Sequence, residues 1–216
     1  MMKFEPDQLR AYFVCGTQDL RPEQDILELV DRVLAAGVTA FQFRDKGPHS
    51  RLTPAQRLEI GRALRQLCRR YQVPFIVDDD LALADATAAD GIHVGQKDGN
   101  IKATVSQVAG RHFIGYSCET TAQIKKANTI GGIDYYGCGP IFPTQSKTDA
   151  DPALGPEGLM ALIKAAKRPV VGIGGITLNN HAQLPTNAAG YAVISYLTRS
   201  QDLTADVAAL LAITAK

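Results

Sequence analysis

The sequence predicts an α/β fold, a (β/α)8 TIM barrel formed by a single domain over residues 1–216. Short apolar runs alternate with longer amphipathic segments along the whole chain, which is the pattern of repeated βα units. Eight such units in about 200 residues fit a compact barrel. A doubly wound open sheet is the alternative. Polar residues at the ends of several runs favour the barrel, because its strand ends converge on one rim.

Eight short apolar runs, several of them rich in β-branched or aromatic residues, predict the strands. They cover residues 11–15, 40–44, 74–78, 91–95, 112–117, 134–139, 169–174 and 190–195. Helical patterns lie between them at 22–36, 53–71, 120–129, 156–166 and 202–215. Pro54 and Pro156 stand at plausible first positions of two of these helices.

Composition narrows the class of protein. The chain has 216 residues, of which 45% are hydrophobic, so it can bury one full core. Its 23 basic and 22 acidic residues give a net charge of +1, so no global charge attracts nucleic acid or an anionic membrane. The N-terminus lacks the apolar core of a signal peptide, and no run approaches the roughly 20 apolar residues of a membrane helix. We therefore expect a cytoplasmic protein; a homo-oligomer is compatible with the sequence.

The four cysteines are widely spaced and form no CxxC pair, which argues against a disulfide framework or a zinc site. We interpret them as buried thiols, and a nucleophilic role for Cys118 or Cys138 is the less favoured alternative. The histidines show no triad or zinc spacing. His93 alternates within a strand and is interpreted as a core residue.

The segment FQFRDKG at 41–47 places Gln42, Arg44 and Lys46 on one face of a strand, opposite Phe41 and Phe43. A stripe of this composition predicts a local anion site. An edge strand with a solvated polar face is the alternative.

Three consecutive carboxylates end the third strand in VDDDLALA, and Asp98 follows the fourth strand. An N-cap role explains one of the three. Crowded carboxylates repel one another unless a cation lies among them. Asp79 and Asp98 are therefore candidate ligands for a Mg²⁺ ion that keeps several waters and also binds substrate phosphate.

Two later segments predict further binding groups. The long loop CGPIFPTQSKTDADPALGPEG carries Lys147 beside Thr144 and Ser146; it is interpreted as a binding loop, with a flexible surface excursion as the alternative. The GIGG string that ends at Gly175 predicts bare backbone amides that can bind phosphate after the seventh strand. Ile194 and Ser195, at the end of the eighth strand, would belong to the same phosphate site.

Seven segments in order, FQFRDKG, PFIVDDDLALA, ADGIHVGQKD, IGYSCET, DYYGCGPIFPTQSKTDA, PVVGIGGIT and AVIS, resemble the thiamine-phosphate synthase family along nearly the whole chain. The resemblance implies a TIM barrel and a Mg²⁺-dependent enzyme. Such an enzyme joins hydroxymethylpyrimidine diphosphate to hydroxyethylthiazole phosphate and releases thiamine phosphate and pyrophosphate, through dissociative loss of the pyrophosphate.

The resemblance also implies roles for individual residues. The pyrimidine diphosphate would be bound by Gln42, Arg44, Lys46, Asp78 and Ser117. Asp79 and Asp98 match the metal ligands. The thiazole phosphate site would comprise Thr144, Ser146, Gly175, Ile194 and Ser195. Lys147 matches the lysine that reaches the pyrophosphate. Catalysis would then rest on Lys147, Arg44, Lys46 and Ser117.

One departure from the family pattern concerns Asp78, where the family usually has asparagine. An ionised aspartate can only accept hydrogen bonds and would repel a diphosphate. From the sequence we favour compensation by metal, with Asp78 helping to hold Mg²⁺. Two other functions remain open: a thiazole tautomerase, whose usual histidine position is Glu119 here, and a non-catalytic binder of a phosphorylated ligand.

Overall fold

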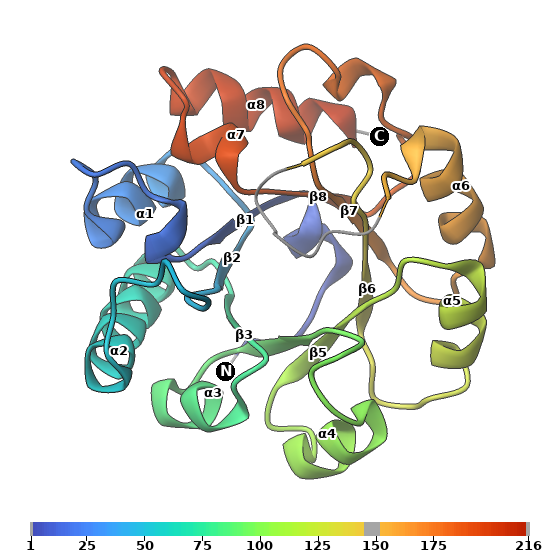
Figure 1. Ribbon diagram of the computed structural model, residues 1–216, viewed down its shortest axis with the longest axis horizontal. Helices are drawn as coiled ribbons and strands as arrows, with labels where there is room; N and C mark the ends of the chain where they lie inside the picture. The colour runs from blue at the N-terminus through green and yellow to red at the C-terminus, as the bar shows by residue number, and fades with distance from the viewer. Residues whose placement is uncertain (1, 145–151, 215–216) are drawn as a thin grey trace.

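A computed structural model describes residues 2–144 and 152–214 and shows a closed barrel of eight parallel strands surrounded by helices (Figure 1). The strands are β1 (Ala11–Cys15), β2 (Ala40–Phe43), β3 (Phe75–Asp78), β4 (Gly91–Val94), β5 (Phe113–Ser117), β6 (Tyr135–Cys138), β7 (Val170–Ile173) and β8 (Gly190–Val193). β1 pairs with β8 in the register Tyr12 to Ala192, which closes the barrel. The barrel prediction is confirmed, and the open sheet is excluded.

The α-helices lie outside the strands. They are α1 (Ile26–Ala35), α2 (Pro54–Arg70), α3 (Leu81–Thr87), α4 (Ile101–Val108), α5 (Thr121–Ala127), α6 (Gly155–Ala165), α7 (Ser195–Thr198) and α8 (Leu203–Ile213). Three short 3₁₀ helices accompany them: η1 (Pro6–Leu9), η2 (Thr17–Asp19) and η3 (His181–Gln183). The connection from β7 to β8 carries η3 in place of an α-helix.

Helix α1 begins four residues later than the sequence pattern predicts. Asp25 is its N-cap, and the carboxylate accepts the backbone N–H groups of Leu27 at 2.8 Å and Glu28 at 3.0 Å. These are donors that a helix leaves unpaired at its start. The predicted start at Pro22 is therefore wrong, because the capping carboxylate fixes the first turn at Ile26.

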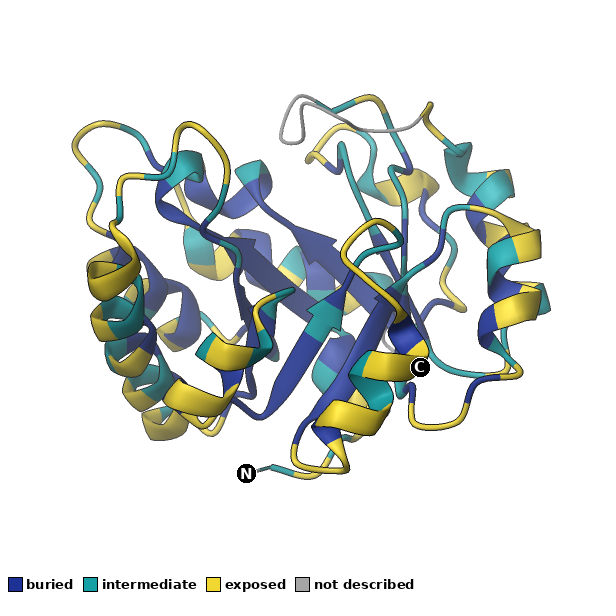
Figure 2. Cartoon of the chain, turned by 60° about the horizontal axis from the view of Figure 1, so that its bottom comes forward, coloured by how far each residue is buried: buried dark blue, intermediate teal, exposed yellow. Residues whose placement is uncertain are grey.

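The core consists of two shells. The larger lies between the strands and the helices and contains residues such as Phe41, Phe43 and Leu64. The smaller fills the barrel interior with Tyr12, Ile76 and other side chains that point inward from alternate strand positions. Figure 2 shows the buried strands at the centre and exposed positions on the outer faces of the helices.

The amino-terminal end of the barrel is closed by the segment before β1. The Phe4 ring lies 5.9 Å from the Tyr135 ring and 5.4 Å from the Phe113 ring, centroid to centroid. The buried carboxylate of Asp90 accepts hydrogen bonds from Met2 N at 2.7 Å, Phe75 N at 3.0 Å and Arg65 Nη2 at 3.0 Å. These contacts stabilise the amino-terminal end of the barrel. The opposite rim, at the carboxyl ends of the strands, is left open for ligand binding.

Within the described ranges, no helix has the length and apolar character needed to cross a membrane.

Candidate active site

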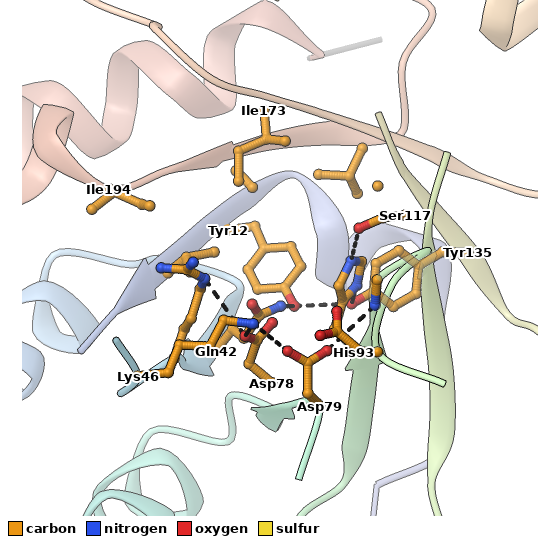
Figure 3. A pocket seen from close by; sticks show the side chains of 17 residues that line it. Tyr12, Gln42, Lys46, Asp78, Asp79, His93, Ser117, Tyr135, Ile173 and Ile194 are labelled. Atoms are coloured by element: carbon orange, nitrogen blue, oxygen red, sulfur yellow. Dashed lines mark hydrogen bonds and ion pairs between the residues drawn. The ribbon is translucent and has the colours of Figure 1, made fainter. Parts of the chain in front are cut away.

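A pocket opens at the carboxyl ends of the strands and reaches into the barrel interior (Figure 3). Its two halves differ in chemistry. Strands β2 to β5 and the turns after them supply the polar half: Gln42, Arg44, Lys46, Asp78, Asp79, His93, Asp98 and Ser117. Strands β1, β7 and β8 and the residue that follows β8 supply an apolar half: Val14, Val171, Ile173, Ala192 and Ile194. The pocket can therefore bind the charged part of a ligand on one side and a flat or apolar part on the other.

Two cations and one carboxylate form the centre of the polar half. Lys46 Nζ lies 2.8 Å from Asp78 Oδ2, and Arg44 Nε lies 3.5 Å from the same oxygen. The ammonium of Lys46 also pairs with the carboxylate of Asp79. Burial lowers the pKa of Lys46, but the attraction of Asp78 and Asp79 outweighs it and raises the pKa above the usual value. Lys46 therefore keeps its positive charge at neutral pH.

Asp79 and Asp98 converge at the edge of the pocket, over Gly95. Asp79 Oδ1 accepts the Gly95 N–H at 3.3 Å, and a β-carbon at Gly95 would collide with the carboxylate of Asp98. Burial raises the pKa of Asp98, and repulsion from Asp79 raises it further. Asp79 thus destabilises the negative charge of Asp98, and a cation beside the two carboxylates would relieve this repulsion.

The three consecutive aspartates have different surroundings. Asp79 has a φ of +58°, a left-handed conformation held in part by its backbone N–H, which donates to the His93 carbonyl at 2.8 Å. Asp80 is the N-cap of α3, and its carboxylate accepts the Leu83 N–H at 2.9 Å. The interpretation of one of the three as an N-cap is confirmed, and the other two carboxylates line the pocket.

A chain of hydrogen bonds crosses the barrel beneath the charged groups, from Gln42 on β2 to Ser117 on β5. Its links are Gln42 Nε2 to Tyr12 OH at 2.7 Å, Tyr12 OH to Tyr135 OH at 2.9 Å, Tyr135 OH to His93 Nδ1 at 3.0 Å and His93 Nε2 to Ser117 Oγ at 3.0 Å. All five side chains line the pocket.

The sequence analysis missed three members of this chain. It treated Tyr12 and Tyr135 as strand residues and His93 as an ordinary core residue, whereas all three line the pocket. The signal lay in the glycines of β5 and β6. Glycine inside a strand marks a close approach of another group. A β-carbon at Gly115 would collide with the Tyr135 and His93 rings, and one at Gly137 would lie 2.8 Å from His93 Cε1.

The predicted thiazole-phosphate residues lie in another sector of the rim. Gly175 has a φ of +68°, and a β-carbon there would lie 2.6 Å from the carbonyl oxygens of Phe142 and Pro143. The loops after β6 and β7 therefore touch at this glycine. Ile194 lines the pocket, while Thr144, Gly175 and Ser195 are not among its lining residues in the described part of the chain. Ser195 begins α7, directly after β8 and Ile194.

Two predicted site residues, Ser146 and Lys147, lie outside the described residues. The loop that carries them is anchored on both sides. Ile141 N donates to Ile173 O at 2.9 Å before it, and Leu154 N donates to Pro140 O at 2.8 Å after it.

The four cysteines are buried and unpaired with one another. Burial raises the pKa of Cys118 to about 12 and that of Cys138 still higher. A thiol needs a lowered pKa to act as a nucleophile near neutral pH. The interpretation of the cysteines as buried thiols is confirmed, and the nucleophile alternative is disfavoured.

The fold and the site together define a class. A closed (β/α)8 barrel with a pocket of converging charged side chains at its strand carboxyl ends has the arrangement of barrel enzymes.

Comparison with known proteins narrows the class. The sequence model of the family described as Thiamine monophosphate synthase matches residues 11–197. The thiamine-phosphate synthase of Lactiplantibacillus plantarum is 56% identical over 217 residues, covering 99% of this chain and 98% of the relative. The chain therefore belongs to the thiamine monophosphate synthase family, a family of enzymes.

Solved structures agree with this assignment. The thiamine phosphate pyrophosphorylase of Pyrococcus furiosus superposes with a TM-score of 0.81 at 33% sequence identity, covering 97% of this chain and 96% of that one. A 3-hexulose-6-phosphate synthase superposes with a TM-score of 0.63 at 16% identity, covering 95% of this chain and 100% of that one, and shares the fold alone.

Proposed function

We propose that the protein is a transferase that joins hydroxymethylpyrimidine diphosphate to hydroxyethylthiazole phosphate, forming thiamine phosphate and releasing pyrophosphate. The observation that carries the proposal is the two-sided pocket, with two cations and two edge carboxylates facing an apolar wall. The relatives named thiamine-phosphate synthase support the same reaction.

The cationic side chains would bind the diphosphate. Arg44 and Lys46 follow β2 and both approach Asp78 Oδ2, and Lys147 would add a third positive charge from the loop after β6. During the reaction the C–O bond to the diphosphate breaks, and negative charge accumulates on the departing pyrophosphate. Fixed cations in a site shielded from water stabilise this developing charge and hence the transition state.

The residues at the pocket edge fit a hard divalent cation. Asp79 and Asp98 bring two carboxylates together at a partly exposed position, and Mg²⁺ prefers oxygen ligands and keeps several waters. Asp79 and Asp98 would hold the ion. When bound, Mg²⁺ would neutralise charge on the diphosphate oxygens.

The proposed bond formation needs no strong general base. The thiazole nitrogen that forms the new N–C bond carries no proton in its reactive form, so no proton has to be removed. The apolar half of the pocket, including Ile173 and Ile194, would exclude water from the electron-poor pyrimidine carbon left by pyrophosphate. Such exclusion matters because water would otherwise capture that carbon.

The thiazole phosphate would lie at the sector formed by the ends of β7 and β8. Gly175 and Ser195 stand there, and Thr144 and Ser146 belong to the adjoining loop. This is the sector at which barrel enzymes frequently bind phosphate.

The tautomerase alternative is disfavoured by the position of Glu119. Its backbone N–H donates to Gln123 Oε1 at 2.6 Å, and Gln123 Nε2 lies 3.4 Å from Glu119 Oε2. The carboxylate thus faces α5, and Glu119 is not among the described residues that line the pocket. A proton-transfer residue would have to reach the substrate.

The test is mass-spectrometric detection of thiamine phosphate from the two substrates, with and without Mg²⁺. We expect product only when both substrates are present, and a large loss of rate when the metal is chelated. Conversion of a thiazole phosphate isomer without the pyrimidine substrate would favour the tautomerase, and binding without turnover would favour the non-catalytic binder. We also propose a cytoplasmic location, where both phosphorylated substrates would be available.

A further inference from the structure

Three members of the hydrogen-bond chain from Gln42 to Ser117 are buried, and its last two, His93 and Ser117, are partly exposed to the pocket. Gln42 is 4% exposed, Tyr12 is 2% exposed and Tyr135 is fully buried. Gly115 and Gly137 leave the space that the His93 ring occupies. The links among Gln42, Tyr12 and Tyr135 are shielded from water, so the proton that each of these groups carries determines whether its neighbour donates or accepts.

The phenols at the centre of the chain each keep one proton. Burial raises the pKa of Tyr12 and of Tyr135 well above the usual value, which keeps both in the neutral form. A neutral phenol can donate one hydrogen bond and accept others. Each tyrosine can therefore donate only one hydrogen bond within the chain.

The amide of Gln42 sets the direction. Its Nε2 can only donate, so Tyr12 OH accepts from it and has its own proton available for Tyr135. Either phenol can donate in the bond between Tyr12 and Tyr135. With Tyr12 as the donor, Tyr135 keeps its own proton for His93 Nδ1, which is then the unprotonated ring nitrogen. In that arrangement the ring proton lies on Nε2, and Ser117 Oγ, 3.0 Å away, accepts it.

We infer that Tyr12, Tyr135 and His93 form a one-way hydrogen-bond chain that positions Ser117, so that its hydroxyl proton points into the pocket. His93 is a positioning residue in this scheme and acts through Ser117. The inference rests on the proposed function for its catalytic consequence, but the direction of the chain is a property of the protein without substrate.

The consequence for a ligand is a fixed pattern of donors and acceptors. Because Ser117 Oγ accepts from His93, its own proton is free to donate to a ligand acceptor, such as a ring nitrogen. The reverse direction would turn Ser117 toward His93 Nε2 and leave only a lone pair for the ligand. A chain with a fixed direction thus lets the pocket prefer an acceptor at this point.

The direct test is ¹⁵N NMR of the histidine rings in the ligand-free protein. We expect His93 to show a pyrrole-type signal at Nε2 and a pyridine-type signal at Nδ1. The chain has four histidines, so His93→Gln assigns the signals. His112 is an internal reference for a protonated Nδ1, which lies 2.9 Å from the Ala89 carbonyl oxygen; its Nε2 lies 2.7 Å from Asp85 Oδ1, so its Nε2 signal is not used for comparison.

A second variant tests the origin of the direction. Tyr135→Phe removes the donor to His93 Nδ1, and we expect a population with the proton on Nδ1 to appear. Tyr12→Phe removes the link through which Gln42 directs Tyr135, so the same population with the proton on Nδ1 should appear in that variant. A proton on Nδ1 in the wild-type protein, or no change in Tyr135→Phe, would overturn the inference, whether or not the protein turns over the proposed substrates.

The catalytic consequence is tested with a matched pair of variants. The amide of His93→Gln can occupy the position of Nε2 and still donate to Ser117, whereas His93→Asn can occupy only the position of Nδ1. We expect the Asn variant to have a kcat about tenfold below that of the Gln variant, the order of one hydrogen bond. Repeating both in Ser117→Ala should remove the difference. Equal kcat for the pair, or a difference that persists in Ser117→Ala, would show that His93 does not act through Ser117.

Discussion

Lys46 Nζ lies 2.8 Å from Asp78 Oδ2, at the position where the resemblance places asparagine in the family. Arg44 Nε lies 3.5 Å from the same oxygen, so two cations neutralise the carboxylate that would otherwise repel a diphosphate. At the candidate metal site, the carboxylate that repels Asp98 is that of Asp79 and not that of Asp78. This geometry favours compensation by Lys46 and Arg44 over the metal compensation expected from the sequence.

Asp78→Asn should therefore lower the KM for the pyrimidine diphosphate. The substitution removes the ion pairs of Arg44 and Lys46 with Asp78, while Lys46 stays paired with Asp79, and KM should fall roughly two- to fivefold. The measurement is KM across a Mg²⁺ titration, with the Mg²⁺ requirement expected to stay unchanged. A higher Mg²⁺ requirement in the variant would instead show that Asp78 helps to hold the metal.

Lys147→Ala should lower kcat by about 10² to 10³, the usual cost of removing one preorganised donor to developing charge. Lys164→Ala, an exposed substitution on α6, is the matched control and should keep the wild-type rate. Thermal melts of both variants check that folding is intact. Near-normal turnover of Lys147→Ala would show that the lysine is merely solvated.

Asp98→Ala should raise the Mg²⁺ concentration needed for half-maximal rate, because it removes one of two carboxylates that converge at the pocket edge. The control is Asp31→Ala, which removes an exposed carboxylate paired with Arg70 at 3.3 Å. A Mg²⁺ titration of Asp98→Ala that matches the wild type would remove Asp98 from the metal assignment.

Asp90→Ala should destabilise the fold and leave the chemistry alone. The side chain is fully buried and accepts three hydrogen bonds at the amino-terminal end of the barrel. Breaking a buried ion pair by removing one partner costs about 3 to 5 kcal/mol. Denaturant unfolding measures the loss, and kcat per folded molecule should be unchanged at a temperature where the variant is folded. A loss under 1 kcal/mol, as expected for an exposed pair, would contradict this account.

The strands could be predicted from the sequence because each is an apolar run with a sharp composition change at its ends. The structure moves their ends by one or two residues at most: β2 stops at Phe43 and β8 at Val193. Helix α1 was placed too early because the periodic pattern extends upstream of the residue that caps it. Capping depends on the backbone conformation of Asp25, and the hydrophobic periodicity of the sequence carries no information about that conformation.

The charged residues of the site were also predictable, since Arg44, Lys46, Asp79 and Asp98 follow strand ends. The side chains in the interior were not. Tyr12, His93 and Tyr135 come from three strands and meet only because the barrel closes, and their hydrogen bonds depend on glycines elsewhere in the sheet. The alternation of side chains along a strand shows which residues point into the barrel, but it does not show which of them are in contact.

The contact of Gly175 with Phe142 and Pro143 has a consequence for protein engineering. Loops on a barrel rim are commonly regarded as exchangeable one at a time, because the scaffold beneath them is rigid. Here any residue larger than glycine at 175 would have to displace the main chain of the neighbouring loop, only a few residues before Ser146 and Lys147. The loops after β6 and β7 should therefore be transplanted between relatives as a pair.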